Sequence, residues 1–412
     1  MLTPALGDHP RPDVRARRVR SAGNDAMTRH LDQVIRGKVI AASTAVDDAA
    51  ITIRGHRIET VQPFVHWRAA HPELAAPPFS GTILPGLVDI HNHGGFGCRF
   101  DTVDGAHART AAESHHASGS TTVVASVVAG PVATMAAQIA VLRELAEEGV
   151  LGGIHAEGPF LSAARCGAQD PRFLCDPDRA STDRILDAGG AHLRVMTLAP
   201  ERPGASAVAA RLADHGVVVA LGHTDADYSG FRDAAPPNGR GTLVTHLANG
   251  MPPLHHRAPG PVAAALVAAA AGAMVVELIG DGVHIDPGFA ALVFATAPGR
   301  VALVSDAIAA VGREDGTYQL GARPVTVRDG VARTADGTIA GGTYTLLQCV
   351  RWLVSECGIS EREAVLAATA TPAEALGLAD VGDLRPGGFA DLVIADDDLR
   401  LRRVLRRGQW LW

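Results

Sequence analysis

Two histidines separated by one residue follow an apolar run in the stretch VDIHNHGG, residues 88–95. Side chains at i and i+2 of a strand point to the same side, so His91 and His93 would present both imidazoles to one space, as a shared metal ion requires. Taken alone, the pair is a weak signal, and loop histidines bonded to the backbone would explain it better. Partners converging on the pair would decide between the two interpretations.

Candidate partners end four other apolar runs: Glu157, His223, His246 and Asp306. A set of imidazoles and carboxylates without a thiolate suits zinc, or else iron, manganese or cobalt. The Glu157 carboxylate has two oxygens and can bridge two ions. One ion would then be held with His91 and His93, and another with His223 and His246.

Asp306 has no imidazole beside it in the sequence. An ion of this kind lowers the pKa of bound water towards about 7 and generates hydroxide at neutral pH. We therefore interpret Asp306 as the general base that takes the water proton and returns it to a leaving group. A role as a further metal ligand is compatible with this one.

The loop THLANGMPPLHHRAPGP, residues 245–261, offers groups that could bind a substrate: Asn249, the backbone around Gly250, and Arg257. In an acidic chain, an arginine beside the site indicates capture of an anion such as phosphate. The alternative is a solvated surface arginine. The stretch DGVHI places His284 near the same site. Cys166, in a loop after the third run, has no base beside it and is expected to be inert.

Eight short apolar runs separated by alanine-rich stretches must position these residues. The runs are ILPGLVDI, TTVVAS, LGGIH, LRVMTL, VVVAL, LVTH, MVVELI and VALVS. Fully apolar strands are typical of a parallel sheet covered on both faces. Eight strand-helix units over about 250 residues predict an α/β fold, the (β/α)8 TIM barrel, in which chemistry occurs at the C-terminal strand ends. The candidate residues fall at those ends.

Short alternating runs with glycine turns lie on both sides of the barrel sequence. They predict a small β-sandwich domain formed from the N- and C-terminal segments. We expect residues 1–27 to be a disordered extension, residues 28–84 with 373–412 to form the β-domain, and residues 85–372 to form the catalytic barrel.

Composition limits the classes of partner. The net charge is −7 over 412 residues, so no nucleic acid or anionic membrane surface is expected to bind. Five scattered cysteines suit a reducing cytoplasm better than a disulfide framework. The uncharged stretch from Pro261 to Val276 contains Gly272 and is mostly alanine. It favours a buried helix followed by a buried strand over a membrane span.

Seven motifs resemble, in order and spacing, those of the N-acetylglucosamine-6-phosphate deacetylases of the amidohydrolase superfamily. The motifs are PGLVDIHNHG, GIHAEGPFL, LGHTDA, VTHLANGMPPLHHRAPG, DGVHI, VSDAI and IAGGTYTL. The resemblance spans about residue 30 to the end, and GIHAEGPFL followed by THLANGM is specific to this family within the superfamily. It implies a metal-dependent hydrolase that removes acetate from an amino-sugar phosphate and leaves glucosamine 6-phosphate.

The same resemblance implies roles for single residues. Glu157, His223 and His246 match metal ligands, and Asp306 matches the catalytic aspartate. The substrate-binding positions that match are Asn249, Gly250, Arg257 and His284, of which the last two match phosphate-binding residues. The family's histidine also reaches across a dimer interface, which implies a homodimer.

Two features depart from the common pattern of the family or vary within it. Gln169 stands where many members carry a histidine that polarises the substrate carbonyl, and an amide cannot provide a cationic donor. His91 and His93 are both kept, although some members lack them and use one metal ion, so this chain could bind one ion or two. Two alternatives stay open: a deacetylase of N-acetylgalactosamine 6-phosphate or another acylated amine, and a metal-free scaffold.

Overall fold

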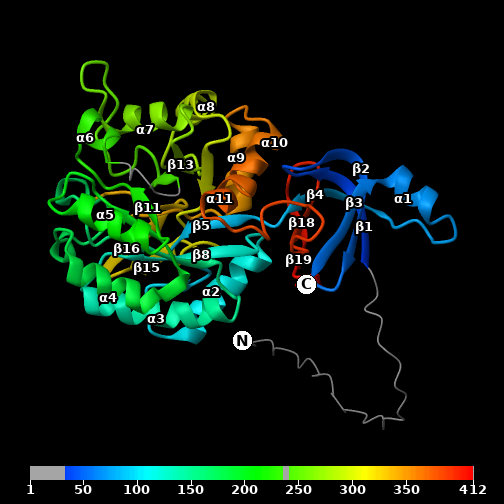
Figure 1. Ribbon diagram of the computed structural model, residues 1–412, viewed down its shortest axis with the longest axis horizontal. Coiled ribbons are helices and arrows are strands. Elements are labelled where there is room, and N and C mark those ends of the chain that lie inside the picture. Colours follow the sequence, from blue (N-terminus) through cyan, green and yellow to red (C-terminus); the bar gives the residue numbers. More distant parts are fainter. Residues whose placement is uncertain (1–32, 235–240, 412) are drawn as a thin grey trace, which may run out of the picture. The chain divides into compact units, whose positions relative to one another are not determined.

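A computed structural model describes residues 33–234 and 241–411 of the chain (Figure 1). The extension expected for residues 1–27 lies outside the described residues. The domain limits drawn at residues 84 and 373 stay a prediction.

Eight parallel strands form the sheet that carries the candidate residues, and they run in the order β14-β13-β12-β11-β10-β9-β8-β5. They are β5 (Val88–Asn92), β8 (Thr122–Val128), β9 (Gly153–Glu157), β10 (Leu193–Leu198), β11 (Val218–Leu221), β12 (Thr242–Val244), β13 (Met274–Ile279) and β14 (Val301–Val304). The sheet curls so that its edge strands meet: the Asp306 N–H donates to the His91 carbonyl at 3.0 Å, and the His93 N–H to the Ala307 carbonyl at 2.8 Å. The predicted barrel is confirmed.

Helices surround these strands (Figure 1). They are α2 (Gly105–Ala117), α3 (Val132–Glu147), α4 (Arg179–Gly189), α5 (Ala205–Asp214), α6 (Tyr228–Arg232), α7 (Gly260–Ala270), α8 (Pro287–Thr296), α9 (Leu346–Ser355), α10 (Glu361–Ala367) and α11 (Ala370–Ala375). The alanine-rich stretch after Pro261 forms α7 and then β13, as predicted, and most of α7 is buried. In the described part of the chain, no helix is both long and apolar enough to cross a bilayer.

Apolar side chains near the starts of the barrel strands pack into a cluster, which also includes Ile279 and Val304 at the ends of two strands. Every barrel strand except β9 contributes to it: Val88, Val124, Val195, Val218, Leu243, Val275 and Ala302. Ala373 and Leu376, from α11 and its C-terminal end, complete the cluster. Because the side chains of a strand alternate between two faces, residues further along the same strands also point into the barrel.

The first apolar run was predicted as one barrel strand, ILPGLVDI, and this is wrong. Ile83 to Pro85 belong to β4 (Phe79–Pro85) in a different sheet, and the barrel strand starts only at Val88. The break lies at Gly86, where an added Cβ would stand 2.0 Å from the Thr121 hydroxyl oxygen. Proline followed by a glycine in such close contact ends one strand and redirects the chain.

Both ends of the chain build the second sheet, as predicted. Its seven strands are β1 (Gln33–Ile40), β2 (Ala45–Arg54), β3 (Arg57–Pro63), β4, β18 (Leu392–Ala395), β19 (Leu401–Arg406) and β20 (Gln409–Trp410). They form one hydrogen-bonded sheet in the order β20-β19-β18-β4-β1-β2-β3. The N-terminal and C-terminal segments of this sheet join where β18 pairs antiparallel with β4, so blue and red strands lie side by side in Figure 1. The short helix α1 (Phe64–Ala70) follows β3.

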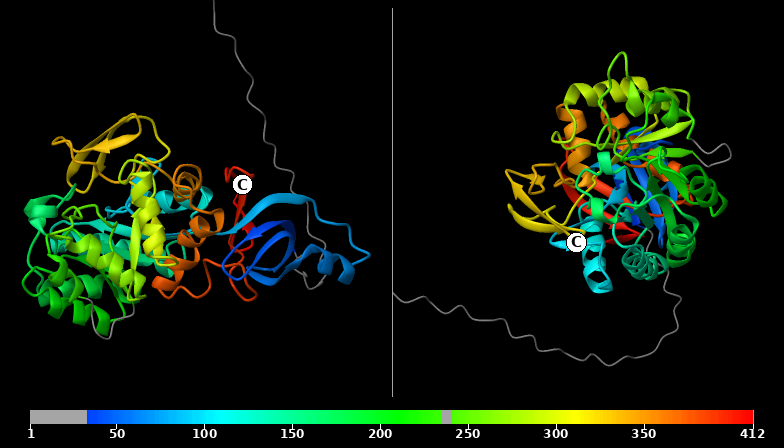
Figure 2. Two further views of the ribbon diagram at one scale, coloured as in Figure 1. Left: turned by 90° about the horizontal axis from the view of Figure 1, so that it is seen from above. Right: turned by 90° about the vertical axis from the view of Figure 1, so that its left-hand side faces the viewer.

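Three further strands follow the barrel strand β14 and were not predicted. They are β15 (Gly316–Leu320), β16 (Arg323–Arg328) and β17 (Val331–Arg333), gold in Figure 2. Leu320 and Val325 pack with Val128 at the end of β8 and with Ile308 after β14. The insertion therefore lies beside the C-terminal ends of the barrel strands.

Candidate functional site

The ends of the barrel strands bring all six predicted metal and catalytic residues together. His91 and His93 come from β5 and the residue after it, Glu157 ends β9, and His223, His246 and Asp306 each follow a strand by two residues. All six are buried. Five of them line a pocket of about 200 Å³, and His91 lies behind His93 and Glu157.

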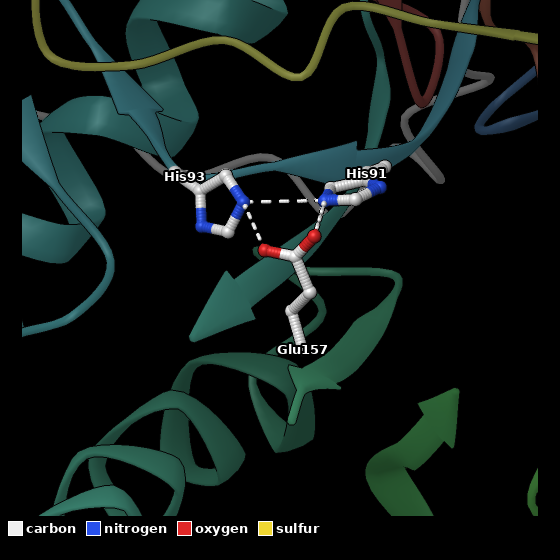
Figure 3. A group of neighbouring side chains, drawn as sticks. All are labelled: His91, His93 and Glu157. Carbon is white, nitrogen blue, oxygen red and sulfur yellow. Dashed lines mark hydrogen bonds and ion pairs between the residues drawn. The ribbon is translucent and has the colours of Figure 1, made fainter. Parts of the chain in front are cut away.

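His91, His93 and Glu157 form the first of two groups that could hold an ion (Figure 3). The Nε2 atoms of His91 and His93 are 3.2 Å apart, and the Nε2 of His93 is 3.2 Å from Oε2 of Glu157. Figure 3 shows both rings turned toward the Glu157 carboxylate. The same-face geometry expected of the two histidines is therefore present.

Glu157, His223 and His246 form the second group. Oε1 of Glu157 lies 3.0 Å from the Nε2 of His223 and 3.0 Å from the Nε2 of His246, and the two nitrogens are 3.1 Å apart. Each group uses the carboxylate of Glu157. A shared carboxylate between two nitrogen pairs is the arrangement that a bridged pair of ions requires.

The hydrogen bonds behind the imidazoles test whether these groups fit a metal ion. The Nδ1–H of His91 donates to the Glu277 carboxylate at 3.0 Å, and the Nδ1–H of His223 donates to the Arg165 carbonyl at 2.8 Å. In its neutral form each ring then directs the lone pair of Nε2 toward Glu157. Metal-ligating histidines are typically fixed in this way, and a cation is what converging lone pairs and carboxylate oxygens attract. The donor set fits a divalent ion such as zinc.

Charges in the site shift the pKa values of its acids and bases. Burial opposes the charge on His93, but hydrogen bonds with Asp306 and Glu157 outweigh burial and raise the pKa of His93 to about 9. Burial likewise opposes ionisation of Asp306, but the charge of His91 and the hydrogen bond from His93 lower the pKa of Asp306 to about 2. Asp306 is therefore a carboxylate at neutral pH and can accept a proton.

The Asp306 carboxylate faces the first group. Its Oδ1 is 3.3 Å from the Nε2 of His93 and 3.5 Å from the Nε2 of His91. This position serves a proton acceptor next to the reaction centre and also serves a further ligand. The two roles predicted for Asp306 both agree with the geometry.

Three of these residues have left-handed backbones, with φ of +46° at His223, +25° at His246 and +44° at Asp306. Such angles are uncommon outside glycine and cost about 1–3 kcal/mol each. Hydrogen bonds hold them in place: the His223 carbonyl accepts from the Ser162 N–H at 2.9 Å, and the Asp306 carbonyl from the Gly342 N–H at 2.7 Å. The turn after each strand thus aims its side chain back into the barrel mouth.

The pocket lining includes four of the five predicted substrate-binding residues: Asn249, Gly250, His284 and Gln169. Arg257 is not among them. Its side chain is exposed and donates to the His256 ring at 2.8 Å. The chain therefore does not bring Arg257 into its own pocket.

Gly250 needs its glycine for two reasons. Its φ is +61°, and an added Cβ would lie 2.9 Å from Nδ1 of His223, which is a metal-ligand candidate. A side chain here would displace that imidazole or the Arg165 carbonyl behind it.

Gln169 is fixed at both ends of its amide. Its Nε2 donates to Oε2 of Glu157 at 2.5 Å, and its Oε1 accepts from the Ala129 N–H at 2.8 Å. The side chain therefore supports the Glu157 carboxylate, and only the second hydrogen of its Nε2 is left for a substrate carbonyl.

His284 owes its orientation to Asp281, which the sequence analysis did not single out. The Asp281 carboxylate accepts from Nδ1 of His284 at 2.7 Å and from two backbone N–H groups, those of Val283 and His284, at 2.9 Å each. Burial opposes the charge on His284, but the hydrogen bond to Asp281 outweighs it and raises the pKa of His284. The raised pKa favours the cationic form of this ring on the pocket wall, which suits an anionic ligand.

Further buried polar residues lie inside the barrel, and the sequence analysis gave them no role. A hydrogen-bonded row crosses the barrel interior: Ser126, His155, Thr197 and Thr245. Burial lowers the pKa of His155 well below its usual value. Both ring nitrogens lie within hydrogen-bond distance of hydroxyl groups, those of Ser126 and Thr197, and His155 belongs to neither ligand group. Glu277 on β13 is another fully buried polar residue. A polar residue at an inward position of a mostly apolar run is the signal that could have revealed each of them.

Sequence and structure comparisons agree on the relatives of this chain. The amidohydrolase family matches residues 82–411. An N-acetylglucosamine-6-phosphate deacetylase of Bacillus subtilis is 32% identical over 90% of this chain and 94% of its own length. An N-acetylgalactosamine-6-phosphate deacetylase of Escherichia coli O157:H7 is 33% identical over 88% of this chain and 95% of its own.

Solved structures extend the similarity to the fold. The N-acetyl-D-glucosamine-6-phosphate deacetylase of Mycobacterium smegmatis is 38% identical with a TM-score of 0.84, over 92% of this chain and 100% of that one. A variant of that enzyme, solved in complex with N-acetyl-D-glucosamine-6-phosphate, is 37% identical with a TM-score of 0.85, over 92% of this chain and 99% of that one.

Proposed function

We propose a reaction and a substrate for this protein on one premise: the chain belongs to the amidohydrolase family. The protein hydrolyses the acetamido group of N-acetylglucosamine 6-phosphate and releases acetate and glucosamine 6-phosphate. The observation that carries this proposal is the convergence of four imidazoles on the Glu157 carboxylate, with Asp306 beside them, in a chain similar to such deacetylases.

The ligand set supports a divalent ion, most simply zinc, held by Glu157, His223 and His246. A second ion would be held by His91, His93 and Glu157. When bound, such an ion polarises a carbonyl oxygen and lowers the pKa of water towards about 7.

The residues around this centre divide the remaining work. Asp306, ionised at neutral pH, takes the proton of the attacking water and returns it to the departing amine. His284 contributes positive charge for the phosphate, and Asn249 and Gly250 contact the sugar from the pocket wall. Gln169 holds Glu157 and offers its second amide hydrogen to the substrate carbonyl.

Arg257 supports a homodimer as the working unit. Its exposed guanidinium lies outside the pocket lining of its own chain, whereas His284 lies inside it. If Arg257 and His284 both bind the phosphate, then Arg257, and not His284, extends across the dimer interface into the pocket of a second copy of the chain. An Arg257→Ala chain mixed with a chain lacking Asp306 would then regain activity in mixed dimers, because one pocket receives both groups.

N-acetylgalactosamine 6-phosphate should be assayed as a second substrate. The chain is 32% identical to a deacetylase of the glucosamine form and 33% identical to one of the galactosamine form. The decisive experiment compares kcat/KM for N-acetylglucosamine 6-phosphate and its galactosamine epimer, with elemental metal analysis of the same sample. We expect acetate release from at least one of them. Folded, metal-loaded protein that releases acetate from neither epimer would refute the proposal, and protein that binds no metal would favour the scaffold alternative.

A further inference from the structure

Glu277 is the one charged residue of β13, MVVELI, and it is fully buried. A buried carboxylate is unfavourable unless it is paired or hydrogen-bonded. Apolar residues would fill an inward position of a barrel strand at no such cost. The position of Glu277 therefore calls for an explanation other than packing.

The contacts of Glu277 connect the two ligand groups. Its Oε2 accepts from Nδ1–H of His91 at 3.0 Å and from the backbone N–H of His246 at 3.2 Å. His91 belongs to the first group and His246 to the second. One carboxylate oxygen thus fixes a ring in one group and the backbone of a ligand in the other.

The first group depends more heavily on this contact than the second does. Within the described residues, Nδ1 of His93 and Nδ1 of His246 have no hydrogen-bond partner. His91 is therefore the one anchored imidazole of the first group, and its anchor is a side chain. In the second group the anchored ring is His223, held by the Arg165 carbonyl, a backbone atom.

The Glu277 carboxylate could also attract a cation bound nearby. Its second oxygen, Oε1, is buried without a hydrogen-bond partner in the described part of the chain. Glu277, Glu157 and Asp306 together place three carboxylates around the two groups. A second divalent ion close to the first is repelled by it, and added negative charge offsets that repulsion.

From these contacts we propose that Glu277 is a positioning residue that determines whether the group His91, His93 and Glu157 holds an ion. It fixes the ring of His91 with its lone pair toward Glu157 and supplies charge behind that ring. The inference rests on the proposed function only in requiring that the site binds divalent ions.

Metal stoichiometry tests this directly. Wild type, Glu277→Gln and Glu277→Leu are dialysed against a series of buffered zinc concentrations, and bound zinc per chain is measured. The wild type should bind two ions. Glu277→Gln should keep one ion and bind the second about 10–100-fold more weakly, the usual effect of removing the hydrogen-bond partner of a metal-binding histidine. Excess zinc should restore its kcat, because Asp306 and the ligands are unchanged.

Asp391→Asn is the matched control. Asp391 is a buried carboxylate that accepts the Arg407 N–H at 2.6 Å and does not line the pocket. Its replacement should lower the melting temperature and leave the zinc stoichiometry at two. If Glu277→Leu does not fold, Glu277→Gln carries the test. The inference would be overturned if the wild type bound only one ion, or if the wild type and Glu277→Gln bound the second ion equally tightly. A wild type that bound no zinc would overturn the proposed metal site as well.

Discussion

The two ends of the barrel strands differ in chemistry. Near their starts, seven strands pack apolar side chains against one another beside α11. At their ends, the strands place histidines and carboxylates around Glu157. Leu243 and His246 are only three residues apart, yet one lies in the apolar cluster and the other in the pocket. On β12 and just after it, side chains that pack the interior and side chains that line the pocket are thus only a few residues apart. Changes at the two ends should therefore affect different measurements.

Removal of the metal should have the largest effect at the polar end. Dialysis against a chelator should abolish acetate release, because the buried histidines and Glu157 do not by themselves polarise an amide. Added zinc should restore activity. Activity that persists in chelated protein of verified low metal content would contradict the assigned site.

Asp306→Asn should have the next largest effect. The amide keeps the size of the side chain and loses the proton acceptor, so kcat should fall by about 10²- to 10⁴-fold. Bound metal and melting temperature serve as controls and should change little. A loss of metal in parallel with activity would instead identify Asp306 mainly as a ligand.

Leu243→Ala tests the apolar end. Leu243 is fully buried in the cluster at the strand starts, so the free energy of unfolding should fall by about 2–5 kcal/mol. The kcat/KM of the folded protein should stay unchanged. Leu292→Ala, at a leucine that is 48% exposed, is the control and should have little effect in denaturation. A large loss of kcat in folded Leu243→Ala protein would show that the two ends are coupled.

Asp281→Asn should have the smallest effect. It tests whether His284 acts through its charge or through the shape of the pocket wall. Asp281 raises the pKa of His284, so the cation is fully present below the ordinary histidine pKa and is lost as pH rises through the raised value. Without Asp281 the loss should begin at lower pH, and KM for a phosphorylated substrate at neutral pH should rise about 10-fold.

The unphosphorylated sugar is the control for this variant, and its KM should not change. Equal effects on both substrates would mean that Asp281 shapes the pocket and that His284 does not act through its charge.

The sequence predicted the elements best where one strand coincides with one apolar run. Leu193–Leu198 and Met274–Ile279 have the predicted bounds, and the candidate ligands at strand ends were recognisable by residue type. The prediction failed at Pro85 to Val88, where an apolar run continues across two different sheets. Hydrophobicity alone does not mark such a boundary.

Residues behind the ligands were harder to predict because their partners lie on other strands. Glu277 on β13 contacts His91 on β5 across the barrel interior, and this contact depends on the registers of the strands between them. Arg257 illustrates the opposite case. Its residue type indicated anion binding, but its placement outside the pocket depends on the fold of the loop.

The left-handed turns at His223, His246 and Asp306 matter to anyone who would transplant this site into another scaffold. Copying the six side chains onto an ideal barrel would give strands that end in extended or right-handed backbone, and the imidazoles would point elsewhere. The transplant would have to include the turns and the groups that hold them, among them the Ser162 and Gly342 N–H donors. The smallest part of the protein that could be transferred with a working site is therefore the set of strand ends together with their supporting loops.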